Sequence, residues 1–352
     1  MSHTSEPSIP SGEYAICLIG GTGRSGTTVL RQIFALHPDV ASLDTEARFL
    51  ADPDGLVDFD AAMSGGWSPY SFDTKLRRLE KLLRDLGGPR RFGFLTRPDG
   101  KSPARRLSGS DSGFVARWRS TLSGHGLARL LPRYWAINLA VACPAYPELV
   151  EELVNRLVEF RFAGRWMGLP LRRRSSMAYG SPDVSDALRW FCRRFVSCVC
   201  DAQNATHFVE DTPFNVLYFD GIRRLLPESR LVHIHRDPRD VVASYVHRTW
   251  SPSDPEMAAR FYVEIMRRWE AVRESLPPDS FIEVGLAALL DQPEAVLRRV
   301  CGFWGLPWTG ALLGVDLSRS NRGRWRTDLP PKTLRRVEEI LGVYMERYGD
   351  LE

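Results

Sequence analysis

Short apolar runs alternate with amphipathic helical patterns along much of this chain. Residues 14–19 form an apolar run that ends at two glycines, which indicates a buried strand. Further strands are expected at 206–209, 230–235 and 280–284. Strands that alternate with helices predict an α/β fold, in which helices cover both faces of a central, mostly parallel sheet. We therefore expect a three-layer sandwich.

The helical segments are marked by apolar residues three and four positions apart. Residues 27–36 fit a helix that begins just after the first strand and ends at a His-Pro pair. Leucines recur at helical spacing over 76–86, and apolar side chains do so over 149–160 and 296–304. These patterns supply the helical layers of the sandwich.

One segment, residues 87–126, interrupts the alternation. It is rich in Gly, Pro, Ser and Arg and has no apolar period. A long unpatterned stretch of this kind is usually a functional loop or a disordered one. Two interpretations of this segment therefore remain, a solvated insertion and a lid that binds the acceptor. No linker divides the chain. We expect residues 1–352 to form a single domain, with residues 51–205 as a largely helical and loop insertion.

The charge of the chain comes almost wholly from arginine. Its 352 residues carry a formal net charge of +4, and only four of the 47 basic residues are lysines. Arginine suits bidentate contacts to phosphate and sulfate, although genome base composition produces the same bias. The small net charge gives no reason to expect a nucleic-acid partner.

The N-terminus and the cysteines bear on location. Residues 1–12 are polar and lack the layout of a secretion signal, and no stretch approaches the roughly 20 apolar residues of a membrane span. The six cysteines fit buried thiols in a reducing compartment, because Cys198 and Cys200 are too close for a zinc knuckle. We expect a cytoplasmic protein without a membrane span, and no metal site, since no His, Cys or Asp group has convincing ligand spacing.

The strongest local signal is a glycine-rich loop at residues 20–28, between a strand and a helix. In such a loop the backbone N–H groups and the helix N-terminus point at one anion. The pattern Gly21-x4-Gly26 resembles the loop of nucleotide kinases, but Thr27 replaces the lysine that holds a triphosphate. Arg24 is the only cation in the loop. A short terminal phosphosulfate therefore fits better than a triphosphate with magnesium.

A second cluster follows the strand expected at 230–235. Arg236 stands at the end of this strand, and Asp237 is expected to cap the next helix, with Pro238 at its first position. Asp240 stands where the acidic partner of a capping box is found. Ser244 lies on the same helix, so an arginine and a hydroxyl converge near one junction and suit a phosphate. An ion pair of Arg236 with Asp237 or Asp240 is the alternative.

Together the two clusters resemble the sulfotransferases that depend on 3′-phosphoadenosine-5′-phosphosulfate (PAPS), in particular bacterial-type members. The resemblance implies that the loop receives the 5′-phosphosulfate, and that Arg236 and Ser244 receive the 3′-phosphate. The loop residues concerned are Gly23, Arg24, Ser25, Gly26, Thr27 and Thr28.

A stretch near the C-terminus is similar to the same family. Arg322, Gly323, Arg324 and Trp325 match the loop that closes over the donor in many bacterial members. The resemblance covers residues 14–50 and 206–348. Two departures are visible: Asp211 stands where a lysine is frequent, and residues 284–287 replace a usual tyrosine-glutamate-aspartate.

The resemblance also implies the catalytic groups. Arg24 would stabilise the transferring sulfuryl group, and Glu46 matches the general base that follows the family's His-Pro turn. Asp44 is two residues away and could exchange roles with it, and an ion pair of Glu46 with Arg48 is the alternative. His125 is a further candidate base.

The function expected is sulfuryl transfer from PAPS to a hydroxyl of a small molecule, a glycan or a lipid. The alternatives are a small-molecule or nucleotide kinase with a P-loop, and an inactive homologue that binds a nucleotide without turnover. The arginines of 90–106 and of 172–174 could meet an acidic acceptor, or could form a solvated face.

Overall fold

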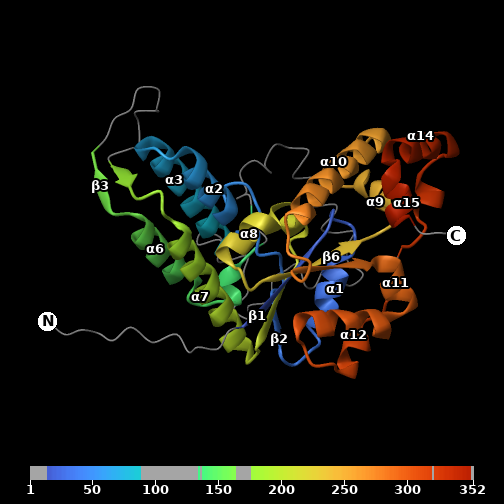
Figure 1. The fold of residues 1–352 in the computed structure, drawn as a ribbon, viewed down its shortest axis with the longest axis horizontal. Helices are drawn as coiled ribbons and strands as arrows, with labels where there is room; N and C mark the ends of the chain where they lie inside the picture. The colour runs from blue at the N-terminus through green and yellow to red at the C-terminus, as the bar shows by residue number, and fades with distance from the viewer. Residues whose placement is uncertain (1–13, 89–133, 135–136, 164–175, 319–320, 350–352) are drawn as a thin grey trace, which may run out of the picture.

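The computed structural model describes residues 14–88, 134, 137–163, 176–318 and 321–349. At its centre lies a five-stranded sheet with the order β2-β5-β1-β6-β7, and every neighbouring pair is parallel (Figure 1). The strands are β1 (Ala15–Gly20), β2 (Val40–Ser42), β5 (His207–Glu210), β6 (Arg230–His235) and β7 (Phe281–Gly285).

Helices cover both faces of the sheet. A smaller hydrophobic cluster joins the sheet to α1 (Thr27–Phe34), α11 (Leu286–Asp291) and α12 (Pro293–Trp304). A larger cluster covers the other face. It draws on α7 (Ser185–Gln203), α8 (Phe219–Leu225), α9 (Pro238–Tyr245), α10 (Pro255–Glu274), α14 (Pro331–Leu341) and α15 (Val343–Tyr348). The predicted three-layer α/β fold is confirmed.

The side chains of β1 show why its sequence is apolar throughout. Ile16 and Leu18 belong to the larger cluster, whereas Cys17 and Ile19 belong to the smaller one. Successive side chains of a strand point to opposite faces, so a strand covered on both sides needs apolar residues at every position.

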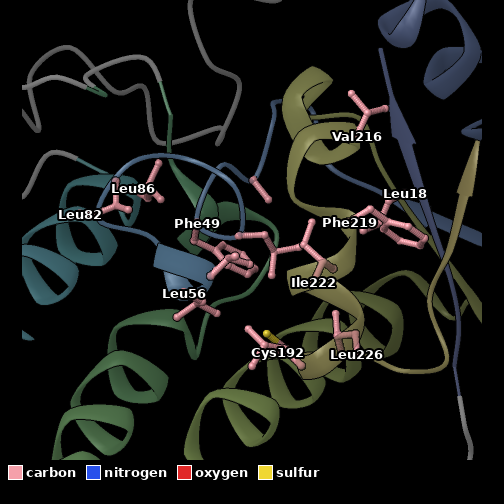
Figure 2. Close-up of a cluster of buried hydrophobic side chains, with 14 of the residues drawn as sticks. Leu18, Phe49, Leu56, Leu82, Leu86, Cys192, Val216, Phe219, Ile222 and Leu226 are labelled. Atoms are coloured by element: carbon pink, nitrogen blue, oxygen red, sulfur yellow. The ribbon is translucent and has the colours of Figure 1, made fainter. Parts of the chain in front are cut away.

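Residues 51–205 add helices to the larger cluster. They include α2 (Leu56–Gly66), α3 (Pro69–Leu86) and α6 (Tyr146–Leu157), and an antiparallel pair of β3 (Phe160–Phe162) with β4 (Met177–Tyr179). Figure 2 shows Leu56 and Leu82 of these helices in one cluster with Leu18 of β1. The helix expected over 149–160 ends at Leu157, because the chain then pairs as a strand. Most of the unpatterned segment 87–126 lies outside the described residues.

Two histidines of β6, one buried and one partly buried, lie beside the C-terminal helix. His233 of β6 shares a hydrogen bond with Glu283 of β7, with 3.0 Å between Nδ1 and Oε1. The ring of the neighbouring His235 lies 4.7 Å from the ring of Tyr348 in α15. Burial, and after it the neighbouring His233, lower the pKa of His235 to about 4. His235 is therefore neutral in the folded protein at neutral pH.

This pKa predicts that acid weakens the fold through His235. In the unfolded chain the imidazole has a pKa of about 6.5, so between pH 6.5 and 4 the unfolded state binds the extra proton. The free energy of unfolding should therefore fall by about 2 kcal/mol through this group between pH 7 and pH 5. Urea unfolding at both pH values should show a smaller fall in His235→Asn than in the native chain. His247→Asn changes an exposed histidine and should keep the native fall; an unchanged fall in His235→Asn contradicts the prediction.

Candidate functional site

The glycine-rich loop joins the carboxyl end of β1 to the first turn of α1. Its backbone is left-handed at Gly23 (φ +76°), Arg24 (φ +62°) and Gly26 (φ +112°), which turns successive peptide groups in one direction. Gly26 caps α1 without any side-chain hydrogen bond, and the first turn carries no acidic residue. The N–H groups at this helix end are thus not engaged by a capping side chain.

Two contacts show how closely the loop is packed. A Cβ atom on Gly21 would lie 2.6 Å from the carbonyl oxygen of Ile234 in β6, so the loop can approach that strand only with glycine here. The hydroxyl of Ser25 is fully buried and has no hydrogen-bond partner among the residues that the structure describes. A buried hydroxyl in a phosphate loop is suited to donate to an anion, so this loop fits a phosphate or sulfate group.

The second cluster lies at the carboxyl end of β6, the neighbour of β1. Asp237 caps α9 as expected, since its carboxylate accepts a hydrogen bond from the N–H of Arg239 at 2.8 Å. Asp240 does not complete a capping box. Its carboxylate instead accepts hydrogen bonds from the N–H groups of Gly323 (2.9 Å) and Trp325 (3.2 Å), because the C-terminal loop lies against this end of α9.

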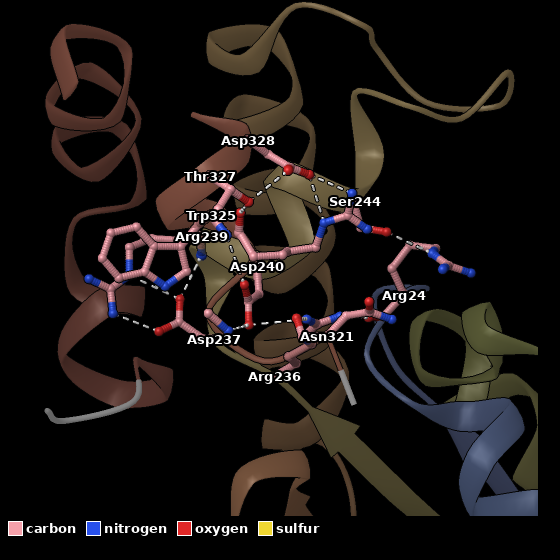
Figure 3. A network of polar contacts seen from close by, with 12 residues as sticks. Arg24, Arg236, Asp237, Arg239, Asp240, Ser244, Asn321, Trp325, Thr327 and Asp328 are labelled. Carbon is pink, nitrogen blue, oxygen red and sulfur yellow. Dashed lines mark hydrogen bonds and ion pairs between the residues drawn. The ribbon is translucent and has the colours of Figure 1, made fainter. Parts of the chain in front are cut away.

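Arg236 takes part in the same network, which Figure 3 shows. Its guanidinium pairs with Asp240 at 3.1 Å, and the two side chains are 9% and 1% exposed, so the alternative ion pair is formed but is buried. Arg236 also donates to the carbonyl oxygens of Asn321 and Arg24. The arginine thereby touches both the C-terminal loop and the glycine-rich loop.

The two clusters meet directly at Arg24 and Ser244. The Nε atom of Arg24 donates to the Oγ atom of Ser244 at 2.9 Å, although the residues are 220 positions apart in sequence (Figure 3). Burial lowers the pKa of Arg24, and three other guanidinium groups lower it further: those of Arg248, Arg236 and Arg324. Several positive charges thus gather at one end of the sheet, which suits a ligand with several negative charges.

The C-terminal loop is anchored beside these charges. Gly323 has a left-handed backbone (φ +74°), and Arg324 pairs with Asp328 at the other end of α13 (Trp325–Asp328). The ring of Trp325 packs against the guanidinium groups of Arg239 (4.1 Å) and Arg326 (4.3 Å). Arg322 pairs with Asp291, with 2.9 Å between the guanidinium and the carboxylate. The structure thus gives Arg322 a different partner from the other three residues of the predicted loop.

Glu46 lies in the loop that follows β2 and is partly buried. Its carboxylate pairs with Arg48 at 2.5 Å, so the ion pair considered as an alternative is present. Burial raises the pKa of Glu46, Arg48 lowers it and Glu210 raises it. A carboxylate with a raised pKa is suited to accept a proton in a reaction.

Glu46 approaches the glycine-rich loop through Asp211. Asp211 follows β5, pairs with Arg31 of α1 at 3.0 Å and accepts a hydrogen bond from Thr28. The charge of Glu46 acts on Asp211 and raises its pKa. In the described part of the chain Glu46 makes no hydrogen bond or ion pair with Arg24 itself.

The other candidate bases differ in what surrounds them. Asp44 is exposed, and no hydrogen bond or ion pair engages its side chain within the described ranges. His125 lies outside the described residues, as do the arginines of 90–106 and of 172–174. Neither can be placed relative to the loop.

Sequence reasoning missed three residues of this site. Asp240 was expected in a helix cap or in an ion pair with Arg236, but not in contact with the C-terminal loop, and Glu210 was given no role. Trp250 drew no attention, yet its ring covers the loop: a Cβ atom on Gly23 would lie 3.1 Å from it. The sequence signal available for Trp250 was its place shortly after the helix that carries Ser244. In the structure about half of the surface of this tryptophan faces solvent, which is unusual for so large an apolar side chain.

The described residues contain neither a metal cluster nor a membrane-spanning helix. No three His, Cys, Asp or Glu side chains within them gather as a metal site. None of their helices is long and apolar enough to cross a membrane.

Comparison with family models finds a match, which covers slightly less than half of the chain. Residues 145–310 match the model of the sulfotransferase family, which confirms the predicted resemblance to sulfotransferases. The match includes Arg236 and Ser244 but neither Arg24 nor Glu46. It also begins inside the segment 51–205, for which the sequence motifs showed no resemblance.

Individual relatives are distant. An uncharacterised protein of Aquifex aeolicus (strain VF5) is 24% identical over 147 residues, which are 39% of this chain and only 18% of that protein. Among solved structures, the sulfotransferase domain of the Synechococcus PCC 7002 olefin synthase is 15% identical, with a TM-score of 0.47 and 99% of each chain covered. The sulfotransferase domain from the curacin biosynthetic pathway is 12% identical, with a TM-score of 0.46 and coverages of 97% and 99%.

Proposed function

We propose that this protein transfers a sulfuryl group from PAPS to a hydroxyl group of an acceptor. The match to the sulfotransferase family supports the class of reaction. The observation that carries the choice of donor is the meeting of two distant clusters, where Arg24 of the phosphate loop bonds to Ser244 beside Arg236. Two anion sites side by side at the carboxyl edge of a parallel sheet suit a nucleotide with phosphates at two positions.

Each part of the site has a role in holding the donor. The N–H groups from Ser25 to Thr28 and the guanidinium of Arg24 receive the 5′-phosphosulfate, since they surround one helix end. Arg236 and Ser244 receive the 3′-phosphate. The C-terminal loop, with Gly323, Arg324 and Trp325, closes over the donor. Asp240 holds this loop in place through its hydrogen bonds to the backbone.

The reaction is an in-line displacement at sulfur. The acceptor hydroxyl oxygen forms a bond to sulfur while the bond from sulfur to the bridging oxygen breaks, and the products are a sulfated acceptor and 3′,5′-diphosphoadenosine. Glu46 accepts the hydroxyl proton. Arg24 stabilises the charge that develops on the transferring group and on the leaving oxygen, as in phosphoryl transfer, where positioning and electrostatics dominate.

The acceptor is a small molecule, a glycan or a lipid that carries a hydroxyl group. We assign its binding to residues 51–205, as an insertion within a single domain. The helices α2 and α3 of this segment share a core with the sheet that carries the donor site, which supports this assignment.

Donor recognition predicts a ranking of nucleotides. A ligand that binds only the folded state stabilises it by roughly 2.7 kcal/mol at a hundred times its dissociation constant. Because Arg236 and Ser244 recognise a 3′-phosphate, 3′,5′-diphosphoadenosine should raise the melting temperature far more than 5′-AMP or ATP at equal concentration. A thermal-shift series with the three nucleotides measures this.

The control is a pair of arginine variants. Arg236→Ala should remove the advantage of 3′,5′-diphosphoadenosine over 5′-AMP, whereas Arg260→Ala, which changes an exposed arginine of α10, should keep it. Equal shifts with all three nucleotides exclude the proposed donor, and a preference for ATP favours the kinase alternative. Tight binding without PAPS turnover, with 4-nitrophenol as the acceptor probe, favours the inactive homologue.

A further inference from the structure

A carboxylate with no cationic partner is buried at the end of β5. Glu210 is 2% exposed, and no lysine or arginine of the described residues pairs with it. One oxygen accepts hydrogen bonds from the N–H of Ala47 (2.9 Å) and from both the N–H (2.9 Å) and the hydroxyl of Thr212. The other oxygen accepts a hydrogen bond from the amide of Asn215. A buried carboxylate held only by neutral donors is costly, so its contacts call for a function.

Two hydrogen bonds from the end of β5 hold the backbone just after Glu46. Glu210 binds the N–H of Ala47 directly, and Thr212 accepts a hydrogen bond from the N–H of Arg48 at 3.2 Å. Since the hydroxyl of Thr212 donates to Glu210, both N–H groups are tied to one carboxylate. The end of β5 is thereby hydrogen-bonded to the loop that carries the proposed base.

The loop needs this support because its backbone is strained. Arg48 has φ +62°, a left-handed conformation that costs energy for a residue with a side chain and persists only where its surroundings impose it. Phe49 anchors the next position, with its ring 5.0 Å from that of Phe195. The residue before Arg48 is thus held by the carboxylate of Glu210, and the residue after it is held by the hydrophobic core.

We propose that Glu210 is a positioning residue, which holds the backbone of Ala47 and Arg48 so that the carboxylate of Glu46 faces the acceptor hydroxyl. This inference rests on the proposed function, in which Glu46 is the base. Glu210 itself contacts no substrate and acts through the loop.

Electrostatics supports the same role. The charged groups that face Glu46 are Arg48 and Asp52 of its own loop, and Glu210 and Asp211 at the end of β5. Burial raises the pKa of Glu46, and the negative charge of Glu210 raises it further. Removal of that charge should lower the pKa of Glu46, so the acid limb of the pH profile of kcat should move to lower pH.

The kinetic test compares two replacements of Glu210. Glu210→Ala removes every contact and should lower kcat for PAPS turnover by about 10- to 100-fold, with 4-nitrophenol as the acceptor probe and the KM for PAPS nearly unchanged. Glu210→Gln keeps an acceptor oxygen for Ala47 and Thr212, and the amide of Asn215 can turn its unpaired oxygen toward the new NH₂ group. Glu210→Gln should therefore keep most of kcat, and the acid limb of its pH profile of kcat should lie at lower pH than in the native protein.

A double variant separates positioning from general destabilisation. Once Glu46 is replaced by Gln, the loop has no base to position, so Glu46→Gln with Glu210→Ala should be little slower than Glu46→Gln alone. Glu270→Gln changes a partly buried carboxylate of α10 that bonds to Tyr344 and Arg347, and it should keep native kcat. If Glu210→Ala does not fold, Thr212→Val removes the hydroxyl that bonds to Arg48 and to Glu210 but leaves the bond of Glu210 to Ala47, and it should still lower kcat without raising KM.

A second measurement does not depend on activity. Carboxyl carbon NMR of protein labelled at glutamate gives the pKa of Glu46, assigned by comparison with Glu46→Gln. In Glu210→Gln this pKa should fall, and in Glu270→Gln it should not move. Additive losses in the double variant, a raised KM with unchanged kcat, or an unmoved Glu46 pKa would each overturn the proposal. If the native protein transfers no sulfuryl group, the proposed function fails, and the NMR result still decides whether Glu210 controls Glu46.

Discussion

Replacing Glu46 by glutamine should lower PAPS turnover by roughly 100- to 10,000-fold, the range that a positioned general base contributes. Glutamine keeps the size of the side chain but cannot accept the proton of the acceptor hydroxyl. Binding of 3′,5′-diphosphoadenosine should stay close to native, because Glu46 makes no contact with Arg24 in the described residues. Turnover with one accepted hydroxyl substrate, together with a titration of the diphosphate product, measures both effects.

Asp44→Asn is the matched control for Glu46. Asp44 is exposed two residues earlier in the same loop and should tolerate the change with little loss of turnover. If Asp44→Asn is inactive and Glu46→Gln is active, the two carboxylates exchange roles. If both variants stay active, the base is elsewhere, and His125 is the next residue to replace.

Replacing Arg24 by alanine should lower turnover by about 100-fold or more, as expected when one preorganised donor is removed from the transition state. The loss should appear mainly in kcat, since the loop N–H groups and Arg236 continue to bind the donor. Comparison of kcat with the affinity for 3′,5′-diphosphoadenosine separates the two effects.

Arg24→Lys refines this measurement. Lysine keeps one positive charge but lacks the planar fork of a guanidinium, so it holds Ser244 and a sulfuryl oxygen in a less fixed geometry. Its turnover should lie between those of the native protein and Arg24→Ala. Native turnover in Arg24→Ala would show that the guanidinium has no part in the chemistry.

The parts of the fold that the sequence predicted are those with local patterns. The strand at 230–235 was placed at its observed ends, because an apolar run there meets Asp237 and Pro238, which begin a helix. The strand β2 was not predicted, since it has three residues and gains its stability from pairing with β5, over 160 positions away. Short strands depend on their partners more than on their own sequence.

The site shows the same division. The glycines and Arg24 could be recognised from one continuous segment, because a phosphate loop is a local structure. The contacts of Asp240 with Gly323 and of Glu210 with Ala47 join residues 83 and 163 positions apart. Both bonds join a side chain to a backbone N–H, and any residue except proline supplies such a group. No residue pattern in the partner segment could therefore have indicated them.

The pairing of β2 with β5 also bears on how such a protein can diversify. The chain leaves the sheet after Ser42 and returns at His207, and the N–H groups of Thr206 and His207 both bond to the carbonyl of Asp39. The intervening segment thus starts and ends at adjacent points. Doubling the length of a flexible loop costs only about 0.6 kcal/mol in closure entropy. Evolution can lengthen, shorten or exchange the part of this segment after residue 50, to which we assign acceptor binding, while the loop that carries Glu46 and the strands that present Arg24 and Arg236 are kept.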